Sequence, residues 1–566
     1  MRTIVALTTT FMVLVSHAYA TSWYVNSAGG SDSNNGKSLG TPFLTLQHAA
    51  GVTVAGDTVY VLPGVGYGGG IGGTAPLVIS ISGSGGGTTA NTPCTSQITY
   101  QGYTGPFAPV SAPNSVSGYP RPIINGTQAN FAIYGVNPIS CITISYFEVA
   151  GWNGALTWAG VSANAGAGNY STNQVYNGGG IGFAGTTGGT GTTSPHHIMM
   201  INNIVHDFPG GGIGCNFCDY VTESGNEVYN TAWYGTIGFN GMGTYEQHSI
   251  DAGTGTKVVV SNNIVFNNYN VVPTHGSIIA TTTGSGTNTT GATTIVVASI
   301  SGLNYGASVI DVTNGCVPPN SFVTYYAATF INISNPLKCN VTGASTIQVG
   351  YVTDGEGIII DNNTNTQSDS VAYVGRTLVS NNIVFNNGSA GIQAGPASKN
   401  TDIVFNTIYE NQTTWNTANS YNDNQGAELN DLGAVGLNIY NNVIIAATGA
   451  YVSTVHDTAT STAWSNNAIY GGAGAWSIPG SNNVTTDPMF VNPSINPLTA
   501  NFQLLPGSPA IGAGSTTYSR ITDIAGNPGI YGATPDIGAY AQPCISYGSI
   551  TYQQSPGLAG SACRSR

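Results

Sequence analysis

The sequence predicts an all-β chain that winds into a parallel β-helix and carries a small inserted β subdomain. Three observations support this fold class. Charged residues make up only 6% of the chain, against about 25% in an average protein, and surface helices need such residues. Apolar triplets recur to the end of a glycine-rich chain, which disfavours disorder. The octapeptide SNNIVFNN occurs at 261–268 and again at 380–387, and repetition of this kind is typical of a solenoid.

Asparagine marks the repeating unit. Spacings of 24, 36, 25 and 35 residues separate Asn202 from Asn226, Asn226 from Asn262, Asn381 from Asn406, and Asn406 from Asn441. Helical repeats of similar period are disfavoured by the low charge. Short strands with asparagine at each corner instead indicate a β-helix, because stacked asparagine side chains satisfy the polar groups of successive turns.

The first twenty residues are typical of a secretory signal peptide. A basic residue near the start precedes an apolar stretch and the small-residue site Ala18-Tyr19-Ala20, so we expect cleavage after Ala20. No later apolar run is long and unbroken enough to cross a membrane. The sequence therefore predicts a secreted protein without membrane insertion.

The mature chain divides into four parts. Residues 21–276 are expected to form an N-terminal cap, with a short helix near 44–50, and the first part of the β-helix. The gap between Asn263 and Asp354 is too long for one coil, and residues 277–350 contain strand-like segments, so they are predicted to be the inserted β subdomain. Residues 351–545 would complete the solenoid and close it, and 546–566 would form a C-terminal tail.

Eight cysteines in an exported chain allow disulfides. Proximity in sequence suggests Cys94–Cys141, Cys316–Cys339 and Cys544–Cys563, although connectivity cannot be deduced from sequence. Cys215 and Cys218 remain, in a CxxC arrangement for which we expect a structural role. A zinc half-site or redox pair is the alternative.

Several segments resemble one known superfamily. They lie at 23–66, 208–235, 353–363, 487–494, 502–514 and 535–541, and they are similar to secreted right-handed parallel β-helix proteins of the pectate-lyase-like superfamily. The sequence departs from that group at Gly512 and Ala541, where relatives often carry acidic residues. The resemblance implies a right-handed β-helix. It says less about the reaction, since the superfamily includes lyases, glycosidases, epimerases and non-catalytic adhesins.

Two basic residues fall at the same position in the repeat. Lys257 and Arg376 each lie four residues before the serine of SNNIVFNN, and His197 is the equivalent residue of an earlier coil. Strand alternation predicts that Lys257 points outward, with Arg376 on the adjacent coil. The resemblance implies a role as base and partner in a lyase, where a neighbouring positive charge would lower the pKa of the base. The alternative is two solvated side chains.

Three carboxylates cluster in the segment TDGEGIIID. Asp354, Glu356 and Asp361 could bind Ca²⁺ through oxygen ligands, or a pair of them could act as acid and base in glycoside hydrolysis. Asp361 aligns with Asn216 and Asn240, which also fits a polar ladder. A turn residue bonded to backbone amides is the alternative for Glu356.

Other side chains are candidates for substrate binding. Trp233, Tyr234 and Tyr245 could stack on sugars, and Glu246 and His248 lie in a loop that could overhang a groove. His197 joins them. His206 and Asp207 are expected to form a surface contact.

The net charge of −13 and the ten basic residues exclude a nucleic-acid binder, which needs a basic stripe. We expect a monomeric, extracellular polysaccharide-degrading enzyme, first of all a lyase that cleaves a uronic-acid glycan by β-elimination, with Ca²⁺ as a possible cofactor. A glycoside hydrolase with paired carboxylates is the first alternative, and a non-catalytic carbohydrate-binding adhesin is the second. The low charge also predicts function in acidic surroundings.

Overall fold

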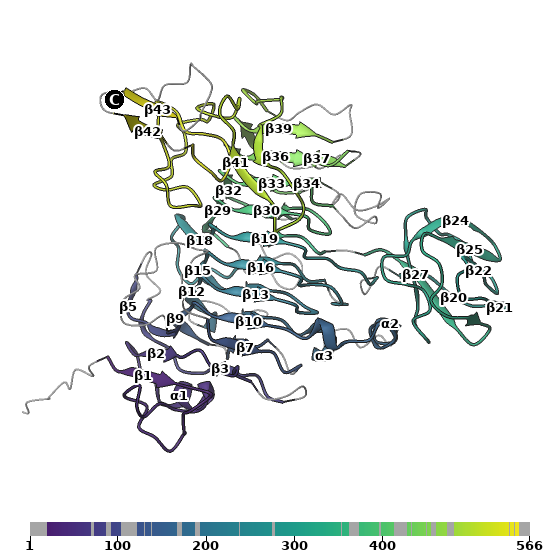
Figure 1. Ribbon diagram of the computed structural model, residues 1–566, viewed down its shortest axis with the longest axis horizontal. Coiled ribbons are helices and arrows are strands. Elements are labelled where there is room, and N and C mark those ends of the chain that lie inside the picture. The colour runs from purple at the N-terminus through teal and green to yellow at the C-terminus, as the bar shows by residue number, and fades with distance from the viewer. Residues whose placement is uncertain are drawn as a thin grey trace, which may run out of the picture.

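The computed structural model describes residues 20–542 except 69–72, 87–91, 104–120, 129–130, 137, 167–172, 187–192, 237, 274–277, 353, 362–372, 396–397, 413–426, 432, 449, 454–459 and 473–479, and it describes the backbone of two further strands near the C-terminus. Three long parallel sheets wind around a common axis, and a smaller β unit projects from their side (Figure 1). The predicted parallel β-helix with an inserted β subdomain is confirmed.

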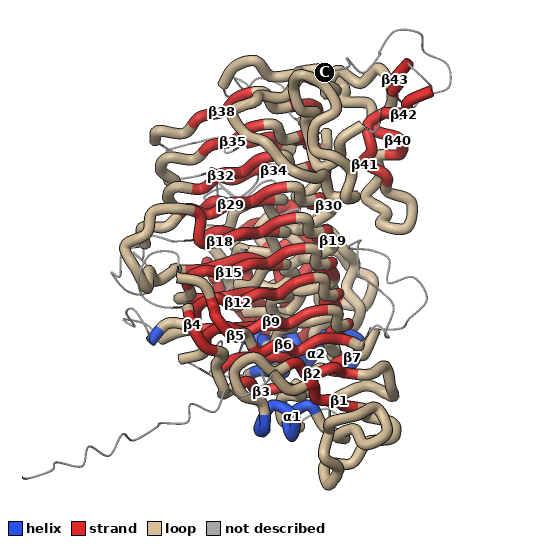
Figure 2. Tube along the Cα trace, turned by 90° about the vertical axis from the view of Figure 1, so that its left-hand side faces the viewer, coloured by secondary structure: helices blue, strands red, loops and turns tan. Residues whose placement is uncertain are grey.

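Each coil contributes one strand to each sheet. Sheet A contains β1 (Ser22–Val25), β2 (Thr58–Val61), β6 (Ile98–Gly102), β9 (Ser140–Ser145), β12 (His196–Ile201), β15 (Asp219–Ser224), β18 (Thr256–Ser261), β29 (Arg376–Ser380), β32 (Thr401–Val404), β35 (Asn438–Tyr440) and β38 (Ala463–Ser465) in that spatial order. Figure 2 shows these strands stacked one above another.

Sheets B and C complete each turn. Sheet B contains β7 (Ile123–Asn125), β10 (Glu148–Ala150), β13 (Ile204–His206), β16 (Glu227–Tyr229), β19 (Ile264–Phe266), β30 (Ile383–Phe385), β33 (Thr407–Tyr409), β36 (Val443–Ala446) and β39 (Ala468–Gly471). Sheet C contains β3 (Leu77–Ile79), β8 (Ile133–Gly135), β11 (Ile181–Ala184), β14 (Ile213–Asn216), β17 (Met242–Tyr245), β28 (Ile358–Asp361), β31 (Ile392–Ala394), β34 (Ala427–Asn430) and β37 (Tyr451–Ser453).

Alternation along the strands fills the solenoid with stacked apolar side chains. In sheet C, Ile213, Ile358 and Ile392 occupy one inward row, as the sequence predicts, but the coil between the first two contributes Met242 rather than residue 237. Burying such a row removes apolar surface from water at every coil, which stabilises the stack.

A ladder of asparagines lies at the tight corner between sheets A and B. In each coil the Nδ2 group donates to the Oδ1 of the next asparagine, as Asn263 does to Asn382 at 3.0 Å. The buried members are Asn203, Asn226, Asn263, Asn382, Asn406, Asn442 and Asn467. The corner stack expected from the sequence is therefore confirmed, and it places the two SNNIVFNN copies on adjacent coils.

A second ladder follows sheet B. Thr231, Asn268, Asn387 and Asn411 bond in succession, and the carboxylate of Glu428 ends the row. The carboxylate accepts hydrogen bonds from the backbone N–H and the side-chain amide of Asn411.

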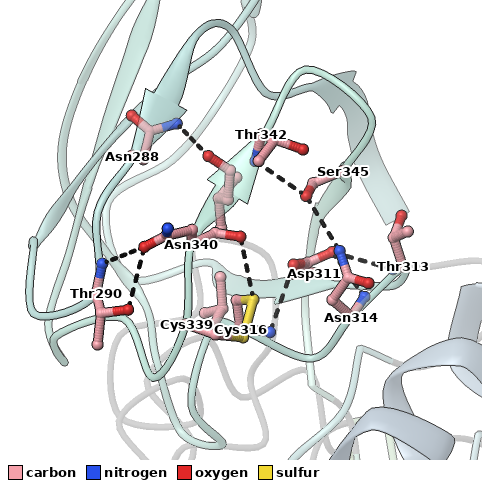
Figure 3. Close-up of a disulfide and its surroundings, with 12 residues drawn as sticks. Asn288, Thr290, Asp311, Thr313, Asn314, Cys316, Cys339, Asn340, Thr342 and Ser345 are labelled. Atoms are coloured by element: carbon pink, nitrogen blue, oxygen red, sulfur yellow. Dashed lines mark hydrogen bonds between the residues drawn. A yellow bond between two sulfur atoms is a disulfide. The ribbon is translucent and has the colours of Figure 1, made fainter.

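The inserted subdomain runs from β20 (Ile278–Thr283) to β27 (Thr346–Gly350), and its own apolar core is built around residues such as Val309 and Ile331. Its other strands are β21 (Thr287–Asn288), β22 (Thr294–Val296), β23 (Ser308–Asp311), β24 (Val323–Ala327), β25 (Phe330–Ile333) and β26 (Val341–Thr342). The Cys316–Cys339 disulfide and its surrounding hydrogen bonds tie one end together (Figure 3).

Helices are few and short in the described chain. They are α1 (Leu46–Val52), a 3₁₀ turn (Asn153–Ala155), α2 (Trp158–Gly166) and α3 (Gln174–Asn177). Helix α1 covers the N-terminal end, near the expected position. Helix α2 packs against the inserted subdomain, where Trp158 Nε1 donates to the carbonyl of Val317 at 2.6 Å. Within the described residues, no helix is long and apolar enough to cross a bilayer.

The closing segment returns along the last coils. It includes the antiparallel strands β40 (Phe490–Asn492) and β41 (Asn501–Leu504), and it packs Phe490 and Phe502 against Phe385 and Tyr409 of sheet B. The strands β42 (Cys544–Tyr547) and β43 (Ile550–Gln553) follow.

Three disulfides are present in the described chain: Cys94–Cys141, Cys215–Cys218 and Cys316–Cys339. The first and third pairings were expected. Cys215 and Cys218 bond to each other, which agrees with a structural role. The expected Cys544–Cys563 pair lies outside the described side chains.

Candidate functional site

Lys257 does not point into solvent as the sequence predicted. Its side chain is 1% exposed, and its ammonium lies 3.0 Å from Asp219 Oδ2 and 2.8 Å from Asp251 Oδ1. Burial alone would lower the pKa of Lys257, but the two carboxylates reverse this and raise it. The expected lowering by a neighbouring cation is therefore wrong, and the ammonium holds its proton more firmly than a solvated lysine does.

The expected register between Lys257 and Arg376 also fails by one residue. A β-bulge in β18 pairs Thr256 with Arg376 and leaves Lys257 as the extra residue. The Arg376 guanidinium instead bonds Asp402, with Nε 3.1 Å from Oδ2. Asp402 also accepts from Asn438 and from Tyr518 of the closing segment. Asp402 thus links the closing segment to sheet A, and Arg376 pairs with its carboxylate.

His197 and Lys257 do share a row, and Tyr220 lies between them. The rings of His197 and Tyr220 stack with centroids 4.4 Å apart, and the Lys257 ammonium lies 5.0 Å from the Tyr220 ring. The Tyr220 hydroxyl donates to Asp251 Oδ2 at 2.9 Å. Burial lowers the pKa of His197, so its imidazole is neutral at neutral pH. His197 and Tyr220 are the half-buried members of this otherwise buried cluster.

The three carboxylates of the TDGEGIIID segment do not converge. Glu356 is fully buried in a turn, where its Oε1 accepts from Ser389 Oγ at 3.0 Å. Asp361 ends β28 on the outer face of sheet C, paired with Tyr245 rather than Asn240, and Asp354 lies in the preceding turn beside Gly238. Among the described residues no group of three His, Cys, Asp or Glu side chains could hold a metal ion. The Ca²⁺ site expected from these residues stays a prediction.

The expected substrate-binding side chains are dispersed. Trp233 Nε1 donates to the carbonyl of Asn267, and Tyr234 packs into the apolar cluster against helix α2 and the inserted subdomain. Tyr245 lies half-buried on sheet C. Glu246 and His248 are fully buried, with His248 Nδ1 3.2 Å from Ser194 Oγ, so neither overhangs a groove.

Four ionisable residues and an isoleucine lie in two neighbouring rows on the outer face of sheet B. Glu148, Ile204 and Glu227 occupy one row on successive coils, and His206 and Tyr229 lie in the neighbouring row. All five are half-buried, and this part of sheet B lies before the coils that the closing segment covers (Figure 1). We call these five residues the sheet B face. In a chain with 6% charged residues, such a concentration marks a candidate site.

Hydrogen bonds order one side of the sheet B face. His206 Nδ1 lies 2.8 Å from Asp207 Oδ2, and its Nε2 lies 3.4 Å from Glu148 Oε1. Burial would lower the pKa of His206, but the two carboxylates raise it. The expected His206–Asp207 contact is present, and it belongs to a longer network that ends at Glu148.

Glu227 has a different environment. Burial raises the pKa of its carboxyl, and only the positive charges of Arg121 and His206 oppose that effect. Burial, followed by the charges of Glu227, Asp207 and Glu148, also raises the pKa of Tyr229 to about 12. The face therefore combines one carboxyl that tends to keep its proton with a second, Glu148, that contacts an imidazole.

The sequence contained a signal for this face that the prediction did not use. The residue after each ladder asparagine is apolar or threonine in most coils, yet Glu227 follows Asn226. Glu148 occupies the same slot after Phe147, whose backbone N–H donates to the ladder residue Asn203. Because Phe147 stands where the other coils carry an asparagine, the asparagine pattern identifies Glu227 but not Glu148.

No protein-family model matches the chain, and no curated protein is detectably similar in sequence. Solved structures with some similarity include pectate lyase Pel9A (15% identity, 92% of this chain and 96% of that chain, TM-score 0.37) and a rhamnogalacturonan lyase (14%, 83% and 91%, 0.37). Another is the A-module of mannuronan C-5 epimerase AlgE6 from Azotobacter vinelandii (14%, 78% and 93%, 0.28). Similarity at this level leaves the function to be argued from the residues of this chain.

Proposed function

We propose that the protein is an extracellular enzyme that cleaves polysaccharides, and that it hydrolyses glycosidic bonds with Glu227 as general acid and Glu148 as general base. The observation that supports this proposal is the parallel register of sheet B, which aligns Glu148, Ile204 and Glu227 on one outward row. The paired-carboxylate hydrolase, an alternative at the outset, becomes the first choice with these residues in place of Asp354 and Glu356.

The row spacing of Glu148 and Glu227 is close to the upper end of the carboxyl separation in inverting glycosidases. Adjacent strands are about 4.8 Å apart, so two residues in the same row on alternate coils are separated by about 9.6 Å. Inverting glycosidases hold their carboxyl groups about 6.5–9.5 Å apart, which leaves room for a water molecule. The intervening Ile204 provides an uncharged floor between them.

Each side chain has a defined task in this scheme. The protonated Glu227 donates its proton to the glycosidic oxygen as the bond from that oxygen to the anomeric carbon breaks. Glu148 takes a proton from the attacking water, whose oxygen forms the new bond to the anomeric carbon. His206, held by Asp207, orients the Glu148 carboxylate.

The test combines a substrate panel with matched variants. Neutral and uronate-containing polysaccharides are incubated with the wild type and with Glu227→Gln, Glu148→Gln and Glu410→Gln, and reducing ends are measured. We expect each of the first two changes to reduce release of reducing ends by at least about a hundredfold, with Glu410→Gln close to wild type. Undiminished hydrolysis by Glu227→Gln would refute the assignment.

A uronate lyase is the second candidate, and the stack of His197 on Tyr220 favours it. In β-elimination the neutral His197 imidazole would take the proton beside the uronate carboxylate, and the Tyr220 hydroxyl would protonate the leaving oxygen. Lys257, the base first expected, would hold Asp251 and the Tyr220 ring in position. New ultraviolet absorbance from an unsaturated product, lost in Tyr220→Phe, would favour this reaction, whereas reducing ends without absorbance favour hydrolysis. No cleavage across the panel would favour a non-catalytic adhesin.

A further inference from the structure

The outer face of one small sheet in the inserted subdomain carries an arrangement suited to binding sugar. Strands β22, β25 and β24 pair in that order, and their register defines two outward rows of three residues. The two rows are Thr294, Asn332 and Tyr325, and Val296, Phe330 and Ala327. We call these six residues the insertion platform.

The opposite side of the same sheet explains why these side chains face outward. Ile295, Ile331 and Val323 are fully buried in the core of the subdomain. Alternation along β22 and β25 then turns the neighbours of Ile295 and Ile331 away from the core. In β24 a bulge between Val323 and Tyr325 places Tyr325 in the outward row, opposite Asn332. Tyr325 is 49% exposed and Val296 is 43% exposed, so both are accessible to a ligand.

Two aromatic rings stack on each other in the platform. Tyr325 and Phe330 lie with centroids 5.8 Å apart and ring planes inclined by 29°. A sugar ring presents a flat apolar face of C–H groups, and an aromatic ring covers such a face at little cost in conformational entropy. At the edge of the platform, Thr294 Oγ1 donates to Asn332 Oδ1 at 2.8 Å. This bond fixes the orientation of the Asn332 side-chain amide, whose N–H groups can then donate to sugar hydroxyls.

The charge of the subdomain indicates which polysaccharide it can bind. Asp311 and Lys338 are the charged residues between 277 and 350. The Asp311 side chain is fully buried and bonds backbone amides near Cys316 (Figure 3). Neither residue belongs to the platform. A face of aromatic, hydroxyl and amide groups without charge offers no counter-ion to a uronate polymer, and it is complementary to an uncharged glycan.

From these contacts we infer that the insertion platform is a binding site for an uncharged polysaccharide chain. The inference rests on the proposed function and deepens it, since it assigns the substrate class that the enzyme would retain. The subdomain is fixed to the solenoid through helix α2, where Trp158 and Val312 pack at the junction. The platform therefore has a defined position relative to the solenoid (Figure 1).

The test is affinity electrophoresis of the full chain in gels that contain galactomannan, xyloglucan or polygalacturonate. We expect retardation by at least one of the neutral polymers and none by polygalacturonate. Tyr325→Ala should weaken the retardation constant about tenfold, as removal of an aromatic anchor does. Tyr470→Ala, which truncates a tyrosine that is 42% exposed on β39, is the matched control and should bind like wild type.

This design distinguishes a failure of the binding inference from a failure of the proposed hydrolysis. Glu227→Gln should be retarded like wild type even if it has lost hydrolysis, so the platform is tested independently of the acid. Equal retardation of Tyr325→Ala and wild type, or no retardation of wild type by either neutral polymer, would overturn the inference. So would a wild-type dimer in sedimentation velocity that Tyr325→Ala dissociates, because a second copy would then occupy the platform.

Discussion

Replacing Glu428 by glutamine should stabilise the protein at neutral pH and have almost no effect at pH 5. Glu428 is fully buried at the end of the second ladder. Burial raises the pKa of its carboxyl from 4.5 to about 8, even though hydrogen bonds from Asn411 oppose the shift. Because the folded state holds this proton more tightly than the unfolded chain, stability from this group is complete below about pH 4.5 and is lost as the pH rises toward 8.

The size of the effect follows from that pKa. In the unfolded chain the Glu428 carboxyl has its ordinary pKa of 4.5, which is about 2.5 pH units below pH 7. Each unit is equivalent to about 1.4 kcal/mol, so keeping the carboxyl protonated in the folded state costs about 3 kcal/mol at pH 7. Glutamine removes this penalty and can still accept from the Asn411 backbone N–H. Its amide replaces one acceptor by a donor, which costs about 1 kcal/mol. The expected net gain is about 2 kcal/mol at pH 7 and about zero at pH 5.

Urea denaturation of wild type and Glu428→Gln at both pH values measures this difference directly. Glu410→Gln is the control, because it removes the neighbouring charge without changing the ladder. A gain from Glu428→Gln that is equal at pH 5 and pH 7, or a loss at pH 7, would refute the reasoning that the buried carboxyl is protonated in the folded state. The expected result would also agree with function in acidic surroundings.

Three further predictions concern stability. Lys257→Met should lower the free energy of unfolding, measured by urea denaturation, by about 3–5 kcal/mol, because it leaves two buried carboxylates without their cation. A change below about 1 kcal/mol would mean that the ion cluster is solvated. Asn263→Ala should cost about 2–4 kcal/mol by leaving ladder partners unsatisfied, and unchanged thermal unfolding would contradict this role of the ladder. Replacing both Cys316 and Cys339 by alanine should destabilise the inserted subdomain by about 3 kcal/mol, seen as faster limited proteolysis within 277–350, whereas equal cleavage rates would show that the disulfide adds nothing.

The fold was predictable because one residue type is required at one corner. Asparagine carries both a donor and an acceptor on a short side chain, so it can bond the coil above and the coil below at once. That chemistry leaves a pattern in the sequence, and Asn263 and Asn382 lie where the pattern places them. Inward isoleucines such as Ile358 followed from strand alternation in the same way.

The candidate site was less predictable for two physical reasons. Strand alternation assumes regular pairing, and the bulge at Lys257 breaks it, while Asp251 and Tyr373 from neighbouring loops enclose its side chain. Proximity in sequence also suggested that Asp354, Glu356 and Asp361 act together, although a β-helix separates close residues by turning the chain. Residues from different coils, such as Glu148 and His206, come into contact instead.

The inserted subdomain has a consequence for how the chain folds. It separates Asn263 from its ladder partner Asn382 by 119 residues, where neighbouring rungs such as Asn382 and Asn406 are 24 apart. Closing the longer loop would cost about 1.4 kcal/mol more if the chain between them were unstructured. Yet the first and last strands of the subdomain pair with each other, Ile278 opposite Gly350. A subdomain that folds first brings its own ends together, so the solenoid can propagate past it almost as if the insertion were a short turn.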